Sequence, residues 1–133
     1  TKDYRVQVWA ESGPYVLTVT GRADDHGNDW QHATPVPFGR TVPGELWEVM
    51  GNVDVFSFQG GKDGIYRIET QQPGNPRGVL RVYDRERGGA TREDTSGEKP
   101  SRSVTFRTPR DDTYYVQVWG GIGKYSLRIT RLK

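Results

Sequence analysis

A segment of 17 residues occurs twice in this chain of 133 residues, once near each end. The first copy, YRVQVWAESGPYVLTVT, begins at Tyr4, and the second, YYVQVWGGIGKYSLRIT, begins at Tyr114. The two copies align without a gap, and both carry the run VQVW. Their separation of about 110 residues is too long for a solenoid repeat and equals the size of one small domain. The duplication therefore predicts one complete module preceded by the end of another.

Three parts of the chain follow from this duplication. We expect residues 1–20 to be the C-terminal β-hairpin of a preceding tandem repeat, residues 21–29 to be an acidic linker, and residues 30–133 to be the complete module. A lone two-stranded hairpin is only marginally stable in water. We therefore expect residues 1–20 to pack on a partner, either the module of their own chain or, by strand exchange in an oligomer, a neighbouring molecule.

Alternation of apolar and polar residues, typical of β-strands, runs through most of the chain. Short strands separated by turns rich in glycine and proline predict an all-β, antiparallel, jelly-roll-like β-sandwich with the extra N-terminal hairpin. Between residues 85 and 102 the alternation is lost, which predicts a mobile loop with a weak edge strand near Thr91. The residues expected to face inward are Asp54, Phe56, Phe58, Tyr66, Ile68, Leu80, Val82, Val104, Phe106, Tyr114, Val116, Val118, Tyr125, Leu127 and Ile129.

The composition excludes several classes of function. There is no cysteine, so disulfides and thiolate metal sites are not available. The 19 basic residues are interleaved with 17 acidic ones, whereas tracking a nucleic-acid backbone needs a surface of one sign. No run is long and apolar enough for insertion into a membrane. Nucleophile elbows, HExxH motifs and phosphate-binding loops are all missing, so we expect no enzymatic activity.

Four motifs in order resemble the bacterial pre-peptidase C-terminal domain, which also includes the collagen-binding module of clostridial collagenases. They are DDHGNDWQHATPV from Asp24, GELWEVMGNVDVFSF from Gly44, GVLRVYD from Gly78, and the second copy of the repeat. The resemblance covers about residues 23–132, together with residues 4–20 as the tail of a preceding copy. It implies a jelly-roll-like sandwich, secretion or a place on the surface of a bacterium, and a non-catalytic role beside a peptidase or another exported enzyme.

The same resemblance implies a calcium site. Calcium takes six to eight oxygen ligands, and a short acidic turn can supply several of them. Asp25 and Asn28 match the acidic segment of the calcium-binding relatives, Asp24 and Asp29 are further candidate ligands, and Asp54 matches the acid that begins the DxFxF strand. Where those relatives often carry another acid, this chain has Gly51. The alternative is that these side chains form Asx turns and bind no metal.

Alternation also predicts a binding face. If Val116 and Val118 point into the sandwich, then Tyr115, Gln117 and Trp119 point to the opposite, wet face. Aromatic side chains are common in binding hot spots, and the resemblance places Trp119 at a position that contacts ligand in collagen-binding relatives. Arg81 and Tyr83 extend this face only if their strand lies in the same sheet. The alternative is that Trp119 covers the end of the sandwich.

Two functions remain open. The chain is either a module that targets a secreted enzyme to an extracellular polymer, a protein such as collagen or a polysaccharide, or a structural repeat of a surface protein or adhesin that contacts neighbouring repeat domains. The aromatic face favours the first function, and the duplication gives weight to the second.

Overall fold

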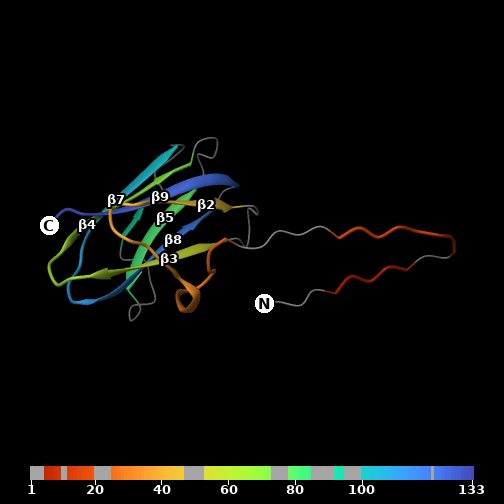
Figure 1. Cartoon of the computed structure of the whole chain (residues 1–133), viewed down its shortest axis with the longest axis horizontal. Coiled ribbons are helices and arrows are strands. Elements are labelled where there is room, and N and C mark those ends of the chain that lie inside the picture. Colours follow the sequence, from red (N-terminus) through yellow and green to blue (C-terminus); the bar gives the residue numbers. More distant parts are fainter. Residues whose placement is uncertain are drawn as a thin grey trace.

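The protein forms a β-sandwich with an extended N-terminal segment, as the computed structural model shows (Figure 1). One sheet has the strand order β1-β3-β8-β5-β6, and the other has the order β2-β9-β4-β7. The structure describes residues 5–9, 12–19, 25–46, 53–72, 78–84, 92–94, 100–120 and 122–133. The elements are η1 (Trp30–His32, a turn of 3-10 helix), β1 (Thr34–Pro35), β2 (Thr41–Leu46), β3 (Asp54–Gly60), β4 (Ile65–Gln71), β5 (Val79–Asp84), β6 (Arg92–Asp94), β7 (Ser101–Arg107), β8 (Asp112–Trp119) and β9 (Gly123–Arg131).

The core lies between the two sheets and is built by the alternating apolar residues. Every side chain expected to face inward is buried, which confirms the all-β sandwich predicted from the sequence. Aromatic rings fill much of this space, with Phe58 stacked on Tyr114 and tilted against Tyr66. Because successive side chains of a strand point to opposite faces, one buried face per strand is enough to build a core from a chain with 32% hydrophobic residues.

The last two strands each lie inside a different sheet, with a neighbouring strand on either side. β8 pairs with β3 and β5 in one sheet, while β9 pairs with β2 and β4 in the other. If residues 1–20 were the hairpin of a preceding repeat, the second copy should also be a hairpin; that expectation is wrong, since its two strands belong to different sheets. The connection between them crosses from sheet to sheet, and Gly123 enters β9 with φ of 120°, a conformation that favours glycine.

The edge strands β1 and β7 differ from the sequence-based prediction, whereas the edge strand β6 agrees with it. β1 pairs with β3 in parallel, whereas the other described pairings are antiparallel, and Pro35 is tolerated there because β1 lies at a sheet edge. The weak edge strand expected near Thr91 is confirmed as β6, which pairs with β5. β7 begins at Ser101, inside the range expected to be a loop.

Among the described residues, no helix has the length and apolar character needed to span a membrane.

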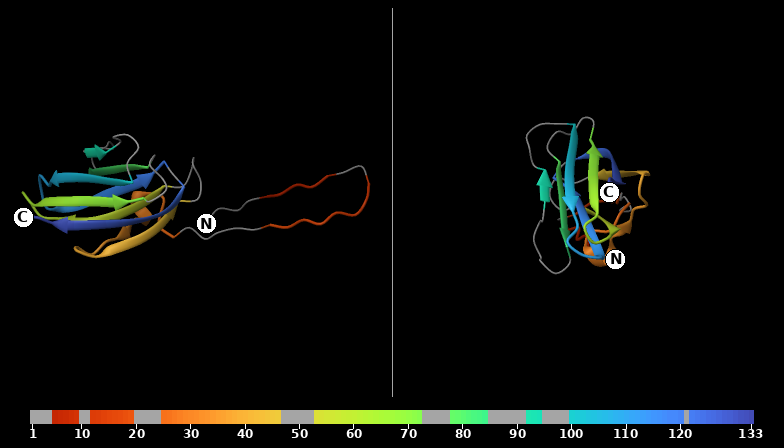
Figure 2. Two further views of the ribbon diagram at one scale, coloured as in Figure 1. Left: turned by 90° about the horizontal axis from the view of Figure 1, so that it is seen from above. Right: turned by 90° about the vertical axis from the view of Figure 1, so that its left-hand side faces the viewer.

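The N-terminal segment projects away from the sandwich as two extended stretches, residues 5–9 and 12–19 (Figure 2). Neither stretch belongs to a strand, so the hairpin expected over residues 1–20 is not a paired β-element in its described part. Its apolar side chains are exposed, from 41% at Val8 to 93% at Val16. The physical reason is that a two-stranded unit buries its apolar face only against a further layer.

Equivalent leucines of the two copies should respond very differently to truncation. Leu127→Ala removes a fully buried side chain at the centre of a sheet, and we expect it to lower the free energy of unfolding by about 2–5 kcal/mol. Leu17, its counterpart in the first copy, is 52% exposed, so Leu17→Ala should change that free energy by less than about 0.5 kcal/mol. Urea unfolding of both variants measures the difference, and equal losses would contradict the exposed position of the segment.

Candidate functional site

The five residues predicted to form the binding face lie together on two neighbouring strands. β5 pairs with β8 so that Val79 is opposite Trp119, Arg81 is opposite Gln117, and Tyr83 is opposite Tyr115. The strand of Arg81 and Tyr83 therefore lies in the same sheet as VQVW, a point that the sequence left open. Because residues directly opposite each other share a face, these side chains form one continuous surface, named here the β5–β8 face.

The rings at one end of the β5–β8 face pack against one another. Tyr83 stacks on Tyr115 with ring centroids 5.6 Å apart, and Trp30 from η1 meets Tyr115 edge-on at 6.3 Å. Tyr115 is consequently only 6% exposed, which corrects the expectation that it faces water. Trp30 is 38% exposed and joins the surface although sequence reasoning had not selected it. Its one signal was its position directly after the acidic run.

At the other end of this face, Trp119 packs against Arg81. The guanidinium carbon of Arg81 lies 4.8 Å from the centroid of the indole, within the range of a cation–π contact. Trp119 is half-buried, and its Nε1 is buried without a hydrogen-bond acceptor in the described structure. One face of the indole is thus occupied by Arg81, and the guanidinium becomes part of the surface that a ligand would meet.

Burial of Tyr83 affects its ionisation. The loss of solvent raises the pKa of the Tyr83 phenol above its ordinary value, and the nearby Tyr115 and Asp29 raise it further. The phenol is therefore a neutral hydrogen-bonding group at physiological pH, and the β5–β8 face carries the positive charge of Arg81 next to uncharged rings.

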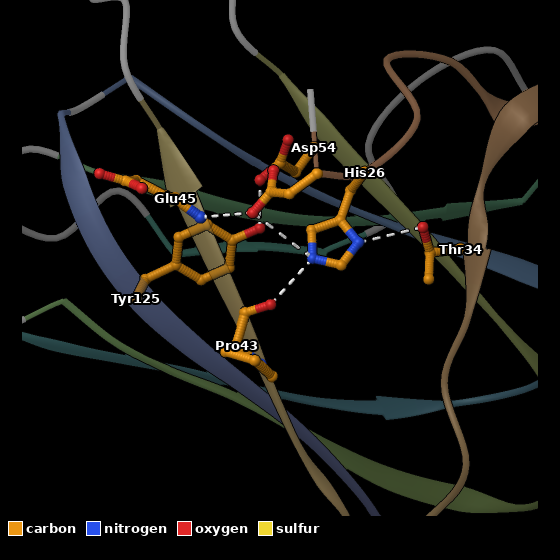
Figure 3. Close-up of polar contacts among 7 residues, drawn as sticks. His26, Thr34, Pro43, Glu45, Asp54 and Tyr125 are labelled. Atoms are coloured by element: carbon orange, nitrogen blue, oxygen red, sulfur yellow. Dashed lines mark hydrogen bonds and ion pairs between the residues drawn. The ribbon is translucent and has the colours of Figure 1, made fainter. Parts of the chain in front are cut away.

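A second group of polar residues lies at the start of β3, around Asp54 (Figure 3). Asp54 is fully buried, and its Oδ2 accepts a hydrogen bond from the hydroxyl of Tyr125 on β9. The Tyr125 ring lies against Gly44 of β2, where any Cβ would overlap it. Glycine at this position therefore makes room for the ring that reaches Asp54.

The acidic run is attached to β2 and β3 by hydrogen bonds. Asp25 Oδ2 accepts from the backbone N–H of Glu45 at 2.8 Å, and the carbonyl of Gly27 accepts from the N–H of Val55 at 2.8 Å. Residues 25–27 thus pack on the sandwich, although they had been assigned to a linker.

His26 links two strands in the same region through its imidazole ring, as Figure 3 shows. Its Nε2 donates to the carbonyl oxygen of Pro43 at 2.9 Å, and its Nδ1 shares a 3.1 Å hydrogen bond with the hydroxyl of Thr34. The imidazole also contacts the Phe56 ring, with centroids 4.5 Å apart. Both nitrogens are engaged, one with β1 and the other with β2, so His26 is part of the structural framework of this region.

Asp29 does not join Asp54. Its Oδ1 caps η1 by accepting from the backbone N–H of His32 at 2.8 Å, and it also accepts from the His32 Nδ1 at 2.7 Å. The hydrogen bond from the His32 side chain lowers the pKa of the Asp29 carboxyl. Asn28 is exposed beside it.

The predicted calcium ligands are therefore only partly brought together. Asp25 and Asp54 both contact neighbouring positions of the β2–β9 pair, Asp29 is bound to His32, and Asp24 lies outside the described residues. No three acidic or histidine side chains of the described structure form a group that could hold a metal ion. Calcium takes about six oxygen ligands, so a calcium site at Asp25 and Asp54 would need further oxygens beside these two carboxylates.

The close approach of Gly44 and Tyr125 gives a direct test of the Asp54 contact. Gly44→Ala places a methyl group inside the Tyr125 ring, and we expect the displaced phenol to leave Asp54 and the free energy of unfolding to fall by about 1–3 kcal/mol. Gly61→Ala is the matched control, because a Cβ there meets its nearest neighbour at 3.8 Å. Thermal unfolding of both variants checks the prediction, and equal stability of the two would contradict it.

Comparison with known proteins identifies the fold. The structure is similar to the pre-peptidase C-terminal domain of a collagenase from Bacillus anthracis, with a TM-score of 0.63 and 15% sequence identity over 84% of this chain and 100% of that domain. The resemblance read from the four sequence motifs is thus confirmed at the level of the fold. No family model and no curated protein matches the sequence.

A second similar structure is the periplasmic inhibitor of g-type lysozyme from Aeromonas hydrophila. Its TM-score is 0.51 with 14% identity, and the match covers 74% of this chain and 95% of the inhibitor. At these identities the likeness concerns the fold alone.

Proposed function

We propose that this chain is a non-catalytic accessory module of a secreted or surface-bound bacterial enzyme, most simply a peptidase, and that it holds the enzyme on an extracellular polymer through the β5–β8 face. The observation that carries the proposal is the gathering of Arg81, Tyr83, Gln117 and Trp119 on one surface. Its fold, shared with a domain of a collagenase, supports an accessory role in an exported protein.

The chemistry of the β5–β8 face suits a polymer. Half-buried rings fixed by their neighbours offer apolar area at little cost in conformational entropy. Tyr83 is held by Tyr115, and Trp119 is held by Arg81, so both rings are ordered before a ligand arrives. Rings and a guanidinium stack equally on proline or on sugar, and the choice between collagen and polysaccharide is therefore left to experiment.

The remaining polar features support a structural role. Asp25 and His26 form hydrogen bonds to β1 and β2, and Asp54 of β3 accepts one from β9. These side chains therefore link strands of the sandwich. A shallow cavity of about 230 Å³ on the outer side of the other sheet is lined by Thr41, Glu69, Gln71, Ser126 and Arg128. The lining includes two hydroxyl side chains but no histidine that could act as their general base. Because the cavity is polar and open, it suits water better than a buried substrate.

Binding can be measured by retention of the protein on insoluble collagen and on insoluble polysaccharide. We expect Arg81→Ala and Tyr83→Ala to weaken retention about tenfold or more, because each removes a side chain that packs on a neighbouring ring of the face. Arg67→Ala is the matched control, since Arg67 is exposed on β4 in the other sheet.

Circular dichroism of each variant separates loss of contact from loss of fold. Retention that stays unchanged in both variants, or that falls equally in Arg67→Ala, would rule out the β5–β8 face as the contact surface.

We also retain calcium as a proposed stabilising ligand, with Asp25 and Asp54 as the described carboxylates and Asp24 as a further ligand. Calcium that binds only the folded chain raises its free energy of unfolding by mass action. We expect millimolar calcium to raise the thermal midpoint relative to excess chelator, and Asp25→Asn to remove the increase. Magnesium is the control, because its small octahedral shell suits such a site poorly. An unchanged midpoint with calcium refutes the proposal.

The duplication favours a second candidate function, that of a structural repeat of a surface protein or adhesin. In that case, the outer faces of the sandwich contact neighbouring repeat domains and no polymer. The retention assay distinguishes the two, because a spacer repeat gives no retention on either polymer above that of an unrelated β-sandwich.

A further inference from the structure

The N-terminal segment carries the core pattern of β8 and β9. Aligned on the second copy, residues 4–20 place an apolar side chain at each of the six positions that β8 and β9 direct into the core. Five of the six are identical, and the sixth exchanges Ile129 for Val19. In the second copy all six side chains are at most 4% exposed. In the first copy the five that the structure describes are 41% to 70% exposed: Val6, Val8, Tyr15, Leu17 and Val19.

The backbone of the segment also matches. Gly13 has φ of 111°, and its counterpart Gly123, which opens β9, has φ of 120°. Both lie in the region that L-residues rarely adopt. At this one position the segment thus keeps, outside any sheet, the backbone conformation with which the second copy enters β9.

Position in the sandwich determines what kind of partner fits. β8 lies between β3 and β5, and β9 lies between β2 and β4. Strands of this kind need two neighbours each, in two different sheets. Pairing the segment with itself as a hairpin therefore cannot reproduce the burial that its side chains have in the second copy.

A further copy of this chain is a poor partner for the same reason. The two positions that the segment would take in its sandwich are already filled by β8 and β9. Insertion of the segment would expel these two strands and expose six equivalent side chains, so such an exchange gains almost no buried apolar area.

We propose that residues 4–20 are the counterparts of β8 and β9 in a second sandwich of the same fold, whose other strands lie upstream in the same polypeptide. One half of the segment completes the centre of one sheet of that sandwich, and the other half completes the centre of the opposite sheet. The partner surface is a pair of sheets with an apolar gap at the β8 and β9 positions. This inference is independent of the polymer that the β5–β8 face binds.

The outward positions of the segment fit this placement. Gln7 and Trp9 correspond to Gln117 and Trp119, which lie on the β5–β8 face. The upstream sandwich therefore presents the same glutamine and tryptophan on its equivalent outer face. Arg5 takes the position of the buried Tyr115, so the rest of that face differs between the two modules.

Hydrogen exchange on the natural full-length polypeptide tests the proposal. The amides of Val6, Val8 and Leu17 should exchange at least about a hundredfold more slowly there than in the 133-residue chain, because they become part of a sheet. Exchange at the unprotected rate in the full-length polypeptide, with β8 and β9 protected, would overturn the proposal. So would a dimer of the 133-residue chain with these amides protected, because the partner would then be a second copy.

A chimera tests whether the segment can serve as β8 and β9. Residues 114–130 of the intact chain are replaced by the sequence of residues 4–20, and a cooperative unfolding transition is expected, with a midpoint lowered by about 5–15 °C. A second chimera retains residues 120–122, because Gly120 has φ of 89° and the segment carries alanine there. The control inserts residues 5–21, a shift of one residue that turns every side chain to the wrong face. Chimeras that unfold no more cooperatively than this control would refute the assignment.

Discussion

β8 and β9 each lie between two neighbouring strands, β8 in one sheet and β9 in the other, and most of the other strands depend on them. β3 and β5 join through β8, and β2 and β4 join through β9, so removing either strand divides a sheet in two. Their six inward side chains lie at the centre of the core, at most 4% exposed. Because these strands come last in the sequence, the core closes only through contacts of long sequence separation, which is typical of β-sandwiches and slows their folding.

Burial of one face leaves the other face available for function. On β5 and β8, the same alternation that directs Leu80, Val82, Val116 and Val118 inward directs Arg81, Tyr83, Gln117 and Trp119 outward. The outward rings are ordered by stacking and by the guanidinium of Arg81. A rigid sheet of this kind positions a contact surface more firmly than a loop does, and the proposed role in holding a polymer rests on that rigidity.

The acidic run illustrates how context redirects a sequence motif. Its abundance of carboxylates suggested calcium ligands, yet Asp29 caps η1 and Asp25 accepts a hydrogen bond from β2. An oxygen that suits calcium also suits a backbone N–H, and the sequence carries no information on which partner lies within reach. The structural roles of His26 and Trp30 were not predicted, because neither motif nor spacing distinguishes a histidine or tryptophan that packs against distant strands.

The sequence by itself determined which side chains face the core, because alternation is a local property that each strand carries in its own residues. It also determined the class of fold and, through four short motifs, its likeness to a domain of known structure. Only the tertiary structure decided which strands are neighbours. It placed β8 and β9 in different sheets where a hairpin was expected, and it placed Arg81 and Tyr83 beside Gln117 and Tyr115. The physical reason is that hydrogen-bonded pairing joins segments far apart in the chain, and equally apolar strands compete for the same partners until the whole core is assembled.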